Sequence, residues 1–295
     1  MSDVRLYHVN RLDREFQNIS PVFKDTIAKA RLAGPEWELE VDDLVSKMWP
    51  TEAALAAAVK GYESFALEIM RLQVDFERTH VYAPYSYMDM LELVYDNHEY
   101  MQTCYLPGLL LAWYLWPHHY RQLRFFQTFL RSMARADALK FYDVATGTGI
   151  YSRLALLRVP TTVGVGYDIS TASCQFTTDH LTAFGVSGRY QMVRENVIEE
   201  TPEPVDWLIC VELIEHLSRP QMLIAALRRM LNPGGKAFLA TAINAPNSDH
   251  IYLLRSVDEA ASLITEGGFR IEQISANVAT SSSKTPPTVV AFICS

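Results

Sequence analysis

The segment from Phe141 to Gly149 places a carboxylate beside a tight glycine turn. It reads Phe-Tyr-Asp-Val-Ala-Thr-Gly-Thr-Gly, and a helical pattern, IYSRLALLR, follows it. Glycine at 147 and 149 lets the backbone approach a ligand and frees N–H groups at the helix start. The carboxylate of Asp143 repels a pyrophosphate but attracts an ammonium group. The pattern therefore favours a cofactor with an amino-acid portion over a dinucleotide, although a glycine turn alone could be no more than a helix cap.

Two later strand-like runs end in polar residues that fit the rest of such a cofactor. The second run ends in Gly-Tyr-Asp-Ile-Ser, which places Asp168 where a carboxylate accepts hydrogen bonds from ribose hydroxyls. The third run, RYQMVRENV, ends in Asn196 and Val197, so we expect a side chain that bonds adenine and a backbone that lines it. Together with Asp143, these positions predict S-adenosylmethionine (SAM) as the cofactor.

A cluster of acidic residues and a histidine follows the fourth strand-like run. The segment Cys-Val-Glu-Leu-Ile-Glu-His places Glu212, Glu215 and His216 within about one turn at the carboxyl end of a strand. His216 or Glu215 is therefore a candidate general base, or a group that orients an acceptor O–H, N–H or acidic C–H. His250 lies in the loop after the fifth run, and loops at that sheet edge converge on one crevice. It is a third candidate catalytic residue.

The elements that must position these residues divide the chain into two parts. Residues 1–137 show apolar side chains at helical spacing, as at Leu55, Val59 and Tyr62, and predict an all-helical cap. Residues 138–295 alternate seven strand-like runs with helical patterns, which predicts an α/β, Rossmann-like, mostly parallel sheet covered by helices. The last two runs are joined by the polar stretch NVATSSSKTPP, so we expect them to form an antiparallel pair at one edge.

The composition of the chain limits the classes of partner that it can bind. The net charge of −8 argues against an acceptor held by its phosphate backbone, so we expect a small-molecule acceptor and no nucleic acid. The amino terminus lacks the apolar stretch of a secretory signal, and the longest apolar run is too short to cross a bilayer. We expect a cytoplasmic protein that does not enter membranes, and its helical half could support a homo-oligomer. Four widely spaced cysteines look like reduced thiols: Cys104, Cys174, Cys210 and Cys294.

Over about residues 139–275 the chain closely resembles the class I SAM-dependent methyltransferases, especially the ubiquinone and menaquinone branch. The motifs that carry the resemblance are DVATGTG, GYDIS, the ENV corner, VDWLICVELIEHL, RPQMLIAALRRMLNPGG, KAFLATAIN and the GGF before the penultimate strand. The resemblance implies a seven-stranded class I methyltransferase sheet. Two positions depart from the commonest pattern, because Ala145 replaces the first glycine and Asn196 replaces the usual aspartate. The implied cofactor-binding residues are Asp143, Ala145, Thr146, Gly147, Gly149, Asp168, Ile169, Asn196, Val197 and Glu212.

The Glu-x-x-Glu-His spacing also raises the question of a metal ion. It is similar to the pattern in metal-dependent ubiquinone-pathway O-methyltransferases and small-RNA 2′-O-methyltransferases, where two carboxylates and a histidine hold a divalent ion beside the acceptor oxygen. A further histidine completes the site in the RNA enzymes. The same motif is widespread among class I methyltransferases that use no metal. The sequence therefore leaves open a divalent metal site at Glu212, Glu215, His216 and His250, although we expect SAM to act without one.

The helical half contains a stretch that is dense in Tyr, Trp, His and Met, from residue 81 to residue 126. Such a segment could form a lid, in which an aromatic face stabilises a cationic sulfonium by about 0.5–2 kcal/mol, or it could simply be a packed core. The candidate substrate contacts are Tyr95, His98, Tyr100 and Tyr105. We expect Trp113, Trp116, Phe125 and Phe126 to be core residues, and His118 and His119 to cap a helix in solvent.

We therefore expect a SAM-dependent methyltransferase that acts on a small molecule, in specialised metabolism, by in-line displacement. His216, Glu215, His250 or a cap tyrosine would supply proton transfer. The sequence leaves open whether N, O, S or C accepts the methyl group. Two alternatives remain. One is a metal-assisted O-methyltransferase, including an RNA 2′-O-methyltransferase, and the other is a SAM-binding module that no longer methylates.

Overall fold

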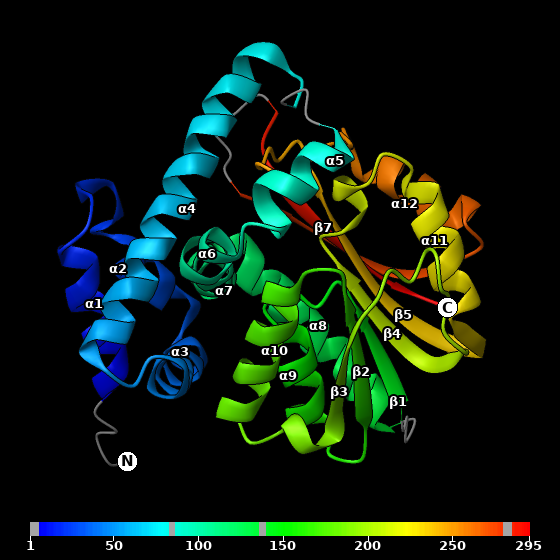
Figure 1. The fold of residues 1–295 in the computed structure, drawn as a ribbon, viewed down its shortest axis with the longest axis horizontal. Coiled ribbons are helices and arrows are strands. Elements are labelled where there is room, and N and C mark those ends of the chain that lie inside the picture. Colours follow the sequence, from blue (N-terminus) through cyan, green and yellow to red (C-terminus); the bar gives the residue numbers. More distant parts are fainter. Residues whose placement is uncertain (1–5, 83–85, 136–139, 280–284) are drawn as a thin grey trace.

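The computed structural model describes residues 6–82, 86–135, 140–279 and 285–295 (Figure 1). The expected boundary at residues 137 and 138 lies outside the described residues, as does the middle of the polar connection, residues 280–284. No helix in the described part of the chain is both long and apolar enough to cross a membrane.

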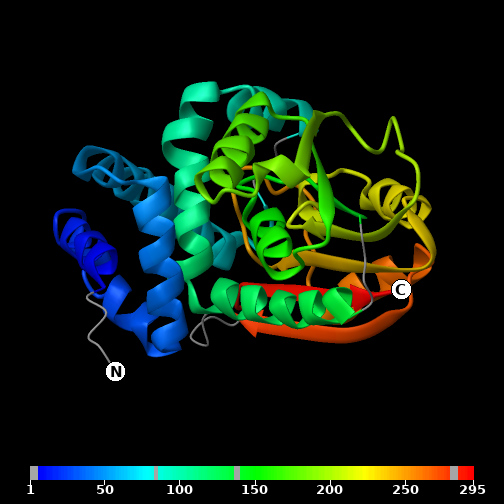
Figure 2. The same ribbon diagram turned by 90° about the horizontal axis from the view of Figure 1, so that it is seen from below.

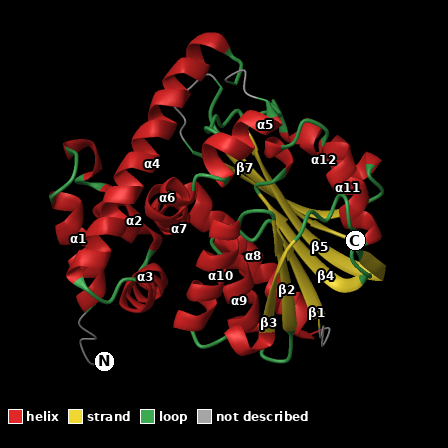
Figure 3. Cartoon of the chain, viewed as in Figure 1, coloured by secondary structure: helices red, strands yellow, loops and turns green. Residues whose placement is uncertain are grey.

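The described residues up to 135 form helices and turns without strands, as the sequence predicts (Figure 3). The elements are α1 (Tyr7–Gln17), η1 (Pro21–Phe23), α2 (Thr26–Ala30), η2 (Arg31–Ala33), α3 (Pro35–Met48), α4 (Glu52–Thr79), α5 (Tyr87–Met90), η3 (Leu91–Tyr95), α6 (His98–Tyr100), η4 (Met101–Tyr105), α7 (Leu106–Leu115) and α8 (Pro117–Arg135).

Helix α4 shows why this half is helical. The Thr51 side chain accepts a hydrogen bond from the Ala54 N–H and so satisfies one of the unpaired donors at the helix start. Leu55, Val59 and Tyr62 then recur at helical spacing and are buried. The helix ends at His80, which has left-handed backbone geometry with φ 57°.

The second half contains a seven-stranded sheet with the order β3-β2-β1-β4-β5-β7-β6. The strands are β1 (Lys140–Val144), β2 (Val163–Asp168), β3 (Tyr190–Arg194), β4 (Val205–Val211), β5 (Leu231–Ile243), β6 (Ile271–Val278) and β7 (Thr288–Cys294). Strands β1 to β5 pair in parallel, whereas β7 is antiparallel to both β5 and β6. The predicted antiparallel pair is thus present at one edge, with β6 outermost.

Side chains alternate between the two faces of the sheet and feed two apolar cores. Phe141 and Trp207 face helices α8 and α9, whereas Tyr142 and Leu208 face α11 and α12. The helices of this half are α9 (Ile150–Arg158), α10 (Thr171–Ala183), η5 (Ser187–Arg189), η6 (Ile214–His216), α11 (Pro220–Arg229) and α12 (Val257–Glu266). Helix α8 precedes the expected domain boundary, yet it covers the sheet beside the red β7 (Figure 2).

The carboxyl ends of the parallel strands meet at one edge, and the backbone there is strained. Ala145 after β1, Glu212 after β4 and Asn244 after β5 have left-handed φ angles of 58°, 51° and 49°. Such conformations are costly for residues other than glycine and are concentrated at functional sites. The cap is bonded to this edge, because the Ser170 hydroxyl donates to the Tyr95 carbonyl at 3.3 Å.

Candidate active site

A cavity of about 610 Å³ lies between the cap and the carboxyl edge of the sheet. This volume is in the range of small-molecule sites. Residues that follow β1, β2, β3 and β4 line one half, including Ala145, Asp168 and Val197. Side chains of α4 and α7 and the starts of α8 and β7 line the other half, which is mostly apolar and aromatic.

The glycine turn after β1 has the geometry that the sequence predicts. Gly147 and Gly149 have φ angles of 51° and 72°, in the left-handed region that favours glycine. A Cβ atom on Gly149 would lie 2.9 Å from Thr177 Cγ2, whereas one on Gly147 would meet no atom within 4 Å. Gly147 and Thr146 line the cavity; Gly149 does not, but caps helix α9 behind it.

Asp168 joins this turn to the end of β2. Its carboxylate oxygens accept hydrogen bonds from the Gly147 N–H at 3.1 Å and the Ser170 N–H at 2.9 Å. Burial raises the pKa of Asp168 to about 6, and these backbone donors oppose the rise. The side chain lines the cavity next to Ile169, where it can accept from ribose hydroxyls.

Asp143 is the second carboxylate of the cofactor half. It is 3% exposed and accepts a hydrogen bond from the Ser152 hydroxyl at 2.6 Å. Burial raises its pKa to about 7, and the bond from Ser152 opposes the rise. A cation that enters the cavity would favour the ionised form of this group.

The corner after β3 provides Asn196 and Val197, and both line the cavity. The Asn196 side-chain oxygen accepts from the Ile198 N–H at 3.1 Å, and its amide nitrogen donates to Glu199 at 2.9 Å. Glu199 is therefore the acceptor for the side-chain amide nitrogen of Asn196. The remaining lone pair of the oxygen can still accept from adenine.

Glu212 is the first residue of the acidic cluster and has the left-handed backbone described above. It lines the cavity, and its Oε1 is buried without a hydrogen-bond partner among the described residues. Burial raises its pKa well above the ordinary range, and the nearby charge of Glu215 raises it further. Burial therefore favours the protonated form of this carboxyl group, and a cation or a donor that reached it would favour the ionised form.

His216 lines the cavity and forms a buried ion pair with Asp249, which is not itself part of the lining. His216 Nδ1 lies 3.3 Å from Asp249 Oδ2, and the same oxygen accepts hydrogen bonds from the Tyr95 hydroxyl at 3.0 Å and the Tyr105 hydroxyl at 2.7 Å. Burial lowers the pKa of His216, but the charge and hydrogen bonding of Asp249 outweigh it and raise the pKa to about 9. Because Nδ1 faces Asp249, Nε2 is the nitrogen that can take a proton from a ligand.

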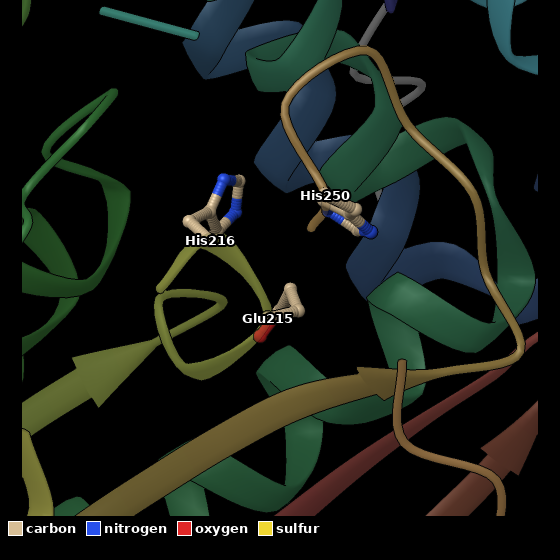
Figure 4. Close-up of side chains that lie close together, drawn as sticks. All are labelled: Glu215, His216 and His250. Atoms are coloured by element: carbon tan, nitrogen blue, oxygen red, sulfur yellow. The ribbon is translucent and has the colours of Figure 1, made fainter. Parts of the chain in front are cut away.

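His250 and Glu215 lie next to His216 (Figure 4). His250 lines the cavity, and its Nδ1 lies 2.6 Å from the Ala245 carbonyl oxygen. Glu215 is fully buried, is not part of the cavity lining, and accepts from the Thr241 hydroxyl at 2.6 Å and the Ala242 N–H at 3.1 Å. Its carbonyl oxygen also accepts from two N–H groups of the loop after His250. Glu215 is thus placed to position that loop, not to touch a substrate.

The proposed metal ligands only partly converge. Single ligand atoms of Glu215, His216 and His250 lie within 4.8 Å of one another, but Glu212 is not in this group. Both oxygens of Glu215 already accept hydrogen bonds, and Asp249 favours a proton on His216. A protonated imidazole cannot ligate a metal and repels a cation. A divalent ion here would have to displace that proton, and Glu212 would contribute no ligand to the group as it lies.

The structure separates the four candidate substrate contacts of the cap. Tyr95 and Tyr105 line the cavity, as the lid hypothesis requires. Tyr100 donates to Glu68 at 2.9 Å and lines a second cavity of about 500 Å³, and His98 is exposed at the surface. The sequence analysis missed Asp249, although it lies directly before His250.

The expectation that His118 and His119 face solvent is wrong. His119 is buried, and both line the cavity together with Trp113 and Trp116, which are therefore not core residues alone. The cause is the position of α8, whose first turns are held at the end of β6, where Val278 pairs with Thr288 of β7. Arg121 donates to Asn277 at 3.2 Å and to the Val278 carbonyl at 3.3 Å. Phe126, in contrast, is fully buried as expected.

The sheet order, the glycine turn and the acidic end of β2 together define a Rossmann-like domain that binds a nucleoside-containing cofactor. A family model described as "Methyltransferase domain" matches residues 118–273, which is more than half of the chain. The chain therefore belongs to the class I SAM-dependent methyltransferase family.

Similar proteins extend this likeness. A ubiquinone biosynthesis O-methyltransferase of Pseudomonas syringae pv. tomato is 33% identical over 129 residues, which is 43% of this chain and 54% of that protein. One of Pseudomonas putida (strain GB-1) is 36% identical over 119 residues, 40% of this chain and 49% of that protein. The chain thus spans about half the length of the curated relatives that it matches.

Two solved structures share the fold over most of the chain. The structure entitled "PigF with SAH" has a TM-score of 0.57 at 14% identity, over 96% of this chain and 93% of that one. The mitomycin 7-O-methyltransferase MmcR has a TM-score of 0.52 at 12% identity, over 87% and 75%. Both therefore resemble the helical half as well as the sheet.

Proposed function

We propose that this protein transfers the methyl group of SAM to a hydroxyl oxygen of a small molecule, with His216 as general base. The observation that carries the proposal is the buried pair of His216 and Asp249, which holds one imidazole nitrogen and leaves the other for a ligand. The names of the sequence relatives, which are O-methyltransferases, also support an oxygen acceptor.

The reaction would conserve charge within the cavity. The positive charge of bound SAM first displaces the proton that Asp249 holds on His216, and this proton leaves to solvent. The freed Nε2 then takes the proton of the acceptor hydroxyl, the oxygen attacks the methyl carbon, and the carbon–sulfur bond breaks in line. The products are a methyl ether, S-adenosylhomocysteine and a protonated His216. The positive charge thus leaves the sulfur and arrives beside Asp249, which stabilises the imidazolium.

The tyrosines of the cap fit this role. Tyr95 and Tyr105 both donate to Asp249, and burial raises the pKa of each well above the ordinary range. Both therefore remain neutral donors that fix the carboxylate rather than bases themselves. A SAM molecule held between these rings and the glycine turn would also be shielded from water, which helps to align the acceptor with the methyl carbon.

The test is the variant His216→Gln, assayed by S-adenosylhomocysteine release with a panel of mono- and dihydroxy aromatic compounds. Loss of a general base should lower kcat by about 10²–10⁴-fold while S-adenosylhomocysteine affinity, measured by calorimetry, stays unchanged. His98→Gln is the matched control, because His98 is exposed and outside the cavity. A His216→Gln protein with the wild-type rate would refute the proposal.

A cytoplasmic location is part of the proposal. Its support is that all four cysteines are free thiols, which suits a reducing compartment. Two of them, Cys210 and Cys294, are buried within the sheet.

A further inference from the structure

The half of the cavity that the cap lines includes the starts of β7 and α8. Thr288, the first residue of β7, pairs with Ile243, the last residue of β5, because the two strands are antiparallel. The start of β7 therefore lies at the carboxyl edge of the sheet, next to the strand that leads into the loop of Asp249. Thr288 and Pro117 both line the cavity, so this half lies where an acceptor would enter.

Four aromatic rings from one short segment form the wall there, and we call them the His–Trp cluster: Trp113, Trp116, His118 and His119. The ring centroids of Trp113 and His119 lie 4.6 Å apart, and those of Trp116 and His118 lie 5.7 Å apart with an interplanar angle of 24°. The two imidazoles are perpendicular at 4.5 Å. These tilted and stacked rings present both faces and edges, which suits contact with another flat ring.

The cluster also contains two polar atoms that nothing satisfies. Nδ1 of His118 and Nδ1 of His119 are buried without a hydrogen-bond partner in the part of the chain that the structure describes. Burial lowers the pKa of His118 to about 3 and that of His119 well below its ordinary value, so both rings are neutral at pH 7. A neutral imidazole offers one donor and one acceptor. Buried polar atoms of this kind are normally paired, and because both residues line the cavity, rotation of either imidazole toward it would let a ligand there supply the partner.

We propose that the His–Trp cluster is a recognition subsite for a flat, uncharged aromatic acceptor with a second polar substituent, a hydroxyl or carbonyl group, remote from the hydroxyl that is methylated. This assignment rests on the proposed function, since it takes the cavity to be the acceptor site. The indole faces hold the ring system, and the two imidazoles bond the second substituent. The cluster thus selects among acceptors, whereas His216 performs the proton transfer.

The probes are 2,7-dihydroxynaphthalene and 2-naphthol, which share the ring system but differ in the second hydroxyl group. Their affinities are measured with the full chain loaded with S-adenosylhomocysteine, by calorimetry and by quenching of tryptophan fluorescence, so that no turnover is needed. We expect the dihydroxy compound to bind about tenfold more tightly, the effect of one buried hydrogen bond. Equal affinities, or no binding of either probe at millimolar concentration, would overturn the proposal.

Variants assign the difference to the cluster. His119→Leu should abolish the affinity ratio without weakening 2-naphthol, and His119→Gln, which keeps a polar side chain, should retain part of it. His98→Leu is the control, because it makes the same replacement at an exposed position. If the ratio of the two affinities is unchanged in both His119→Leu and His118→Leu, the cluster does not bind the second substituent.

These affinities, together with assays of methyl transfer to both naphthols, distinguish the two proposals. If neither naphthol is methylated but the affinity ratio and its loss in His119→Leu are found, the subsite stands and the proposed chemistry falls. If both naphthols are methylated but bind with equal affinity, the proposed chemistry stands and the subsite falls.

Discussion

Replacing Asp249 by asparagine tests the central pair with the smallest change in shape. The asparagine oxygen can still accept from Tyr95 and Tyr105, so the packing around the side chain is kept. What is lost is the charge that overcomes burial and raises the pKa of His216 from 6.5 to about 9. Without it the charge of Glu215 still opposes burial, so the pKa should fall toward 6.5. The expected shift is thus up to about 2.5 units, or about 3.4 kcal/mol at 1.36 kcal/mol per unit.

The shift can be read without any substrate by NMR of protein labelled at the histidine Cε1 positions. The chain has eight histidines, and the His216→Gln variant identifies the resonance that belongs to His216. Asp179→Asn is the matched control, since Asp179 is exposed on α10 and bonds only to Gln175 among the contacts described. A wild-type His216 that titrates near 6.5, or an Asp249→Asn variant that leaves its titration unchanged, would refute the reasoning.

The pair also predicts how stability depends on pH. The pKa of His216 is raised in the folded state, so its stabilisation is fully present below about 6.5 and is lost as the pH rises through about 9. The pKa of Asp249 is lowered, chiefly by His216 against the effect of burial, so its stabilisation is lost as the pH falls below its ordinary value of 3.8. The two pKa shifts arise from the same interaction between His216 and Asp249. The difference in unfolding free energy between wild type and Asp249→Asn should therefore be largest near pH 5–6 and shrink above pH 9.

Four further predictions concern the cofactor half and the metal question. Asp168→Ala should weaken S-adenosylhomocysteine binding about 10–100-fold by calorimetry, the loss of a charge-assisted hydrogen bond; unchanged affinity would remove its ribose role. Gly149→Ala should destabilise the fold by about 1–3 kcal/mol in urea, because φ is 72° and the new methyl lies 2.9 Å from Thr177. Methyl transfer to the hydroxyaromatic panel should survive EDTA, and activity that returns only with added metal would restore the metal hypothesis. SAM binding should release protons from Asp143 and His216 at pH 7, which calorimetry in buffers of different ionisation enthalpy measures, and SAH should release fewer.

Local sequence was sufficient where one segment determines the structure. The glycine turn, the carboxylate at the end of β2 and the alternation of strands with helices each depend on residues close in sequence. The helical half was predictable for the same reason, since the buried positions of α4 recur at helical spacing.

The sequence did not predict the contacts of the site that join residues from distant segments of the chain. Tyr105 and Asp249 are 144 residues apart, and no local pattern indicates that they meet on one carboxylate oxygen. His118 and His119 look like a helix start in solvent, but the position of α8 at the end of β6 buries His119 and places both residues in the cavity wall. The family spacing likewise does not show that Thr241 and Ala242 of β5 already occupy both oxygens of Glu215.

The acidic residues of the site differ in charge because their neighbours differ. Asp249 is kept ionised by a histidine and two tyrosines, whereas Asp143 and Glu212 have few donors and raised pKa values. A cationic cofactor supplies the missing charge to the latter two, and in the proposed reaction methyl transfer then moves that charge from the sulfur to His216. The product S-adenosylhomocysteine leaves the cavity without the sulfonium charge that favoured ionised Asp143. The same electrostatics that draw SAM into the site therefore weaken on transfer, which favours exchange of product for a new cofactor.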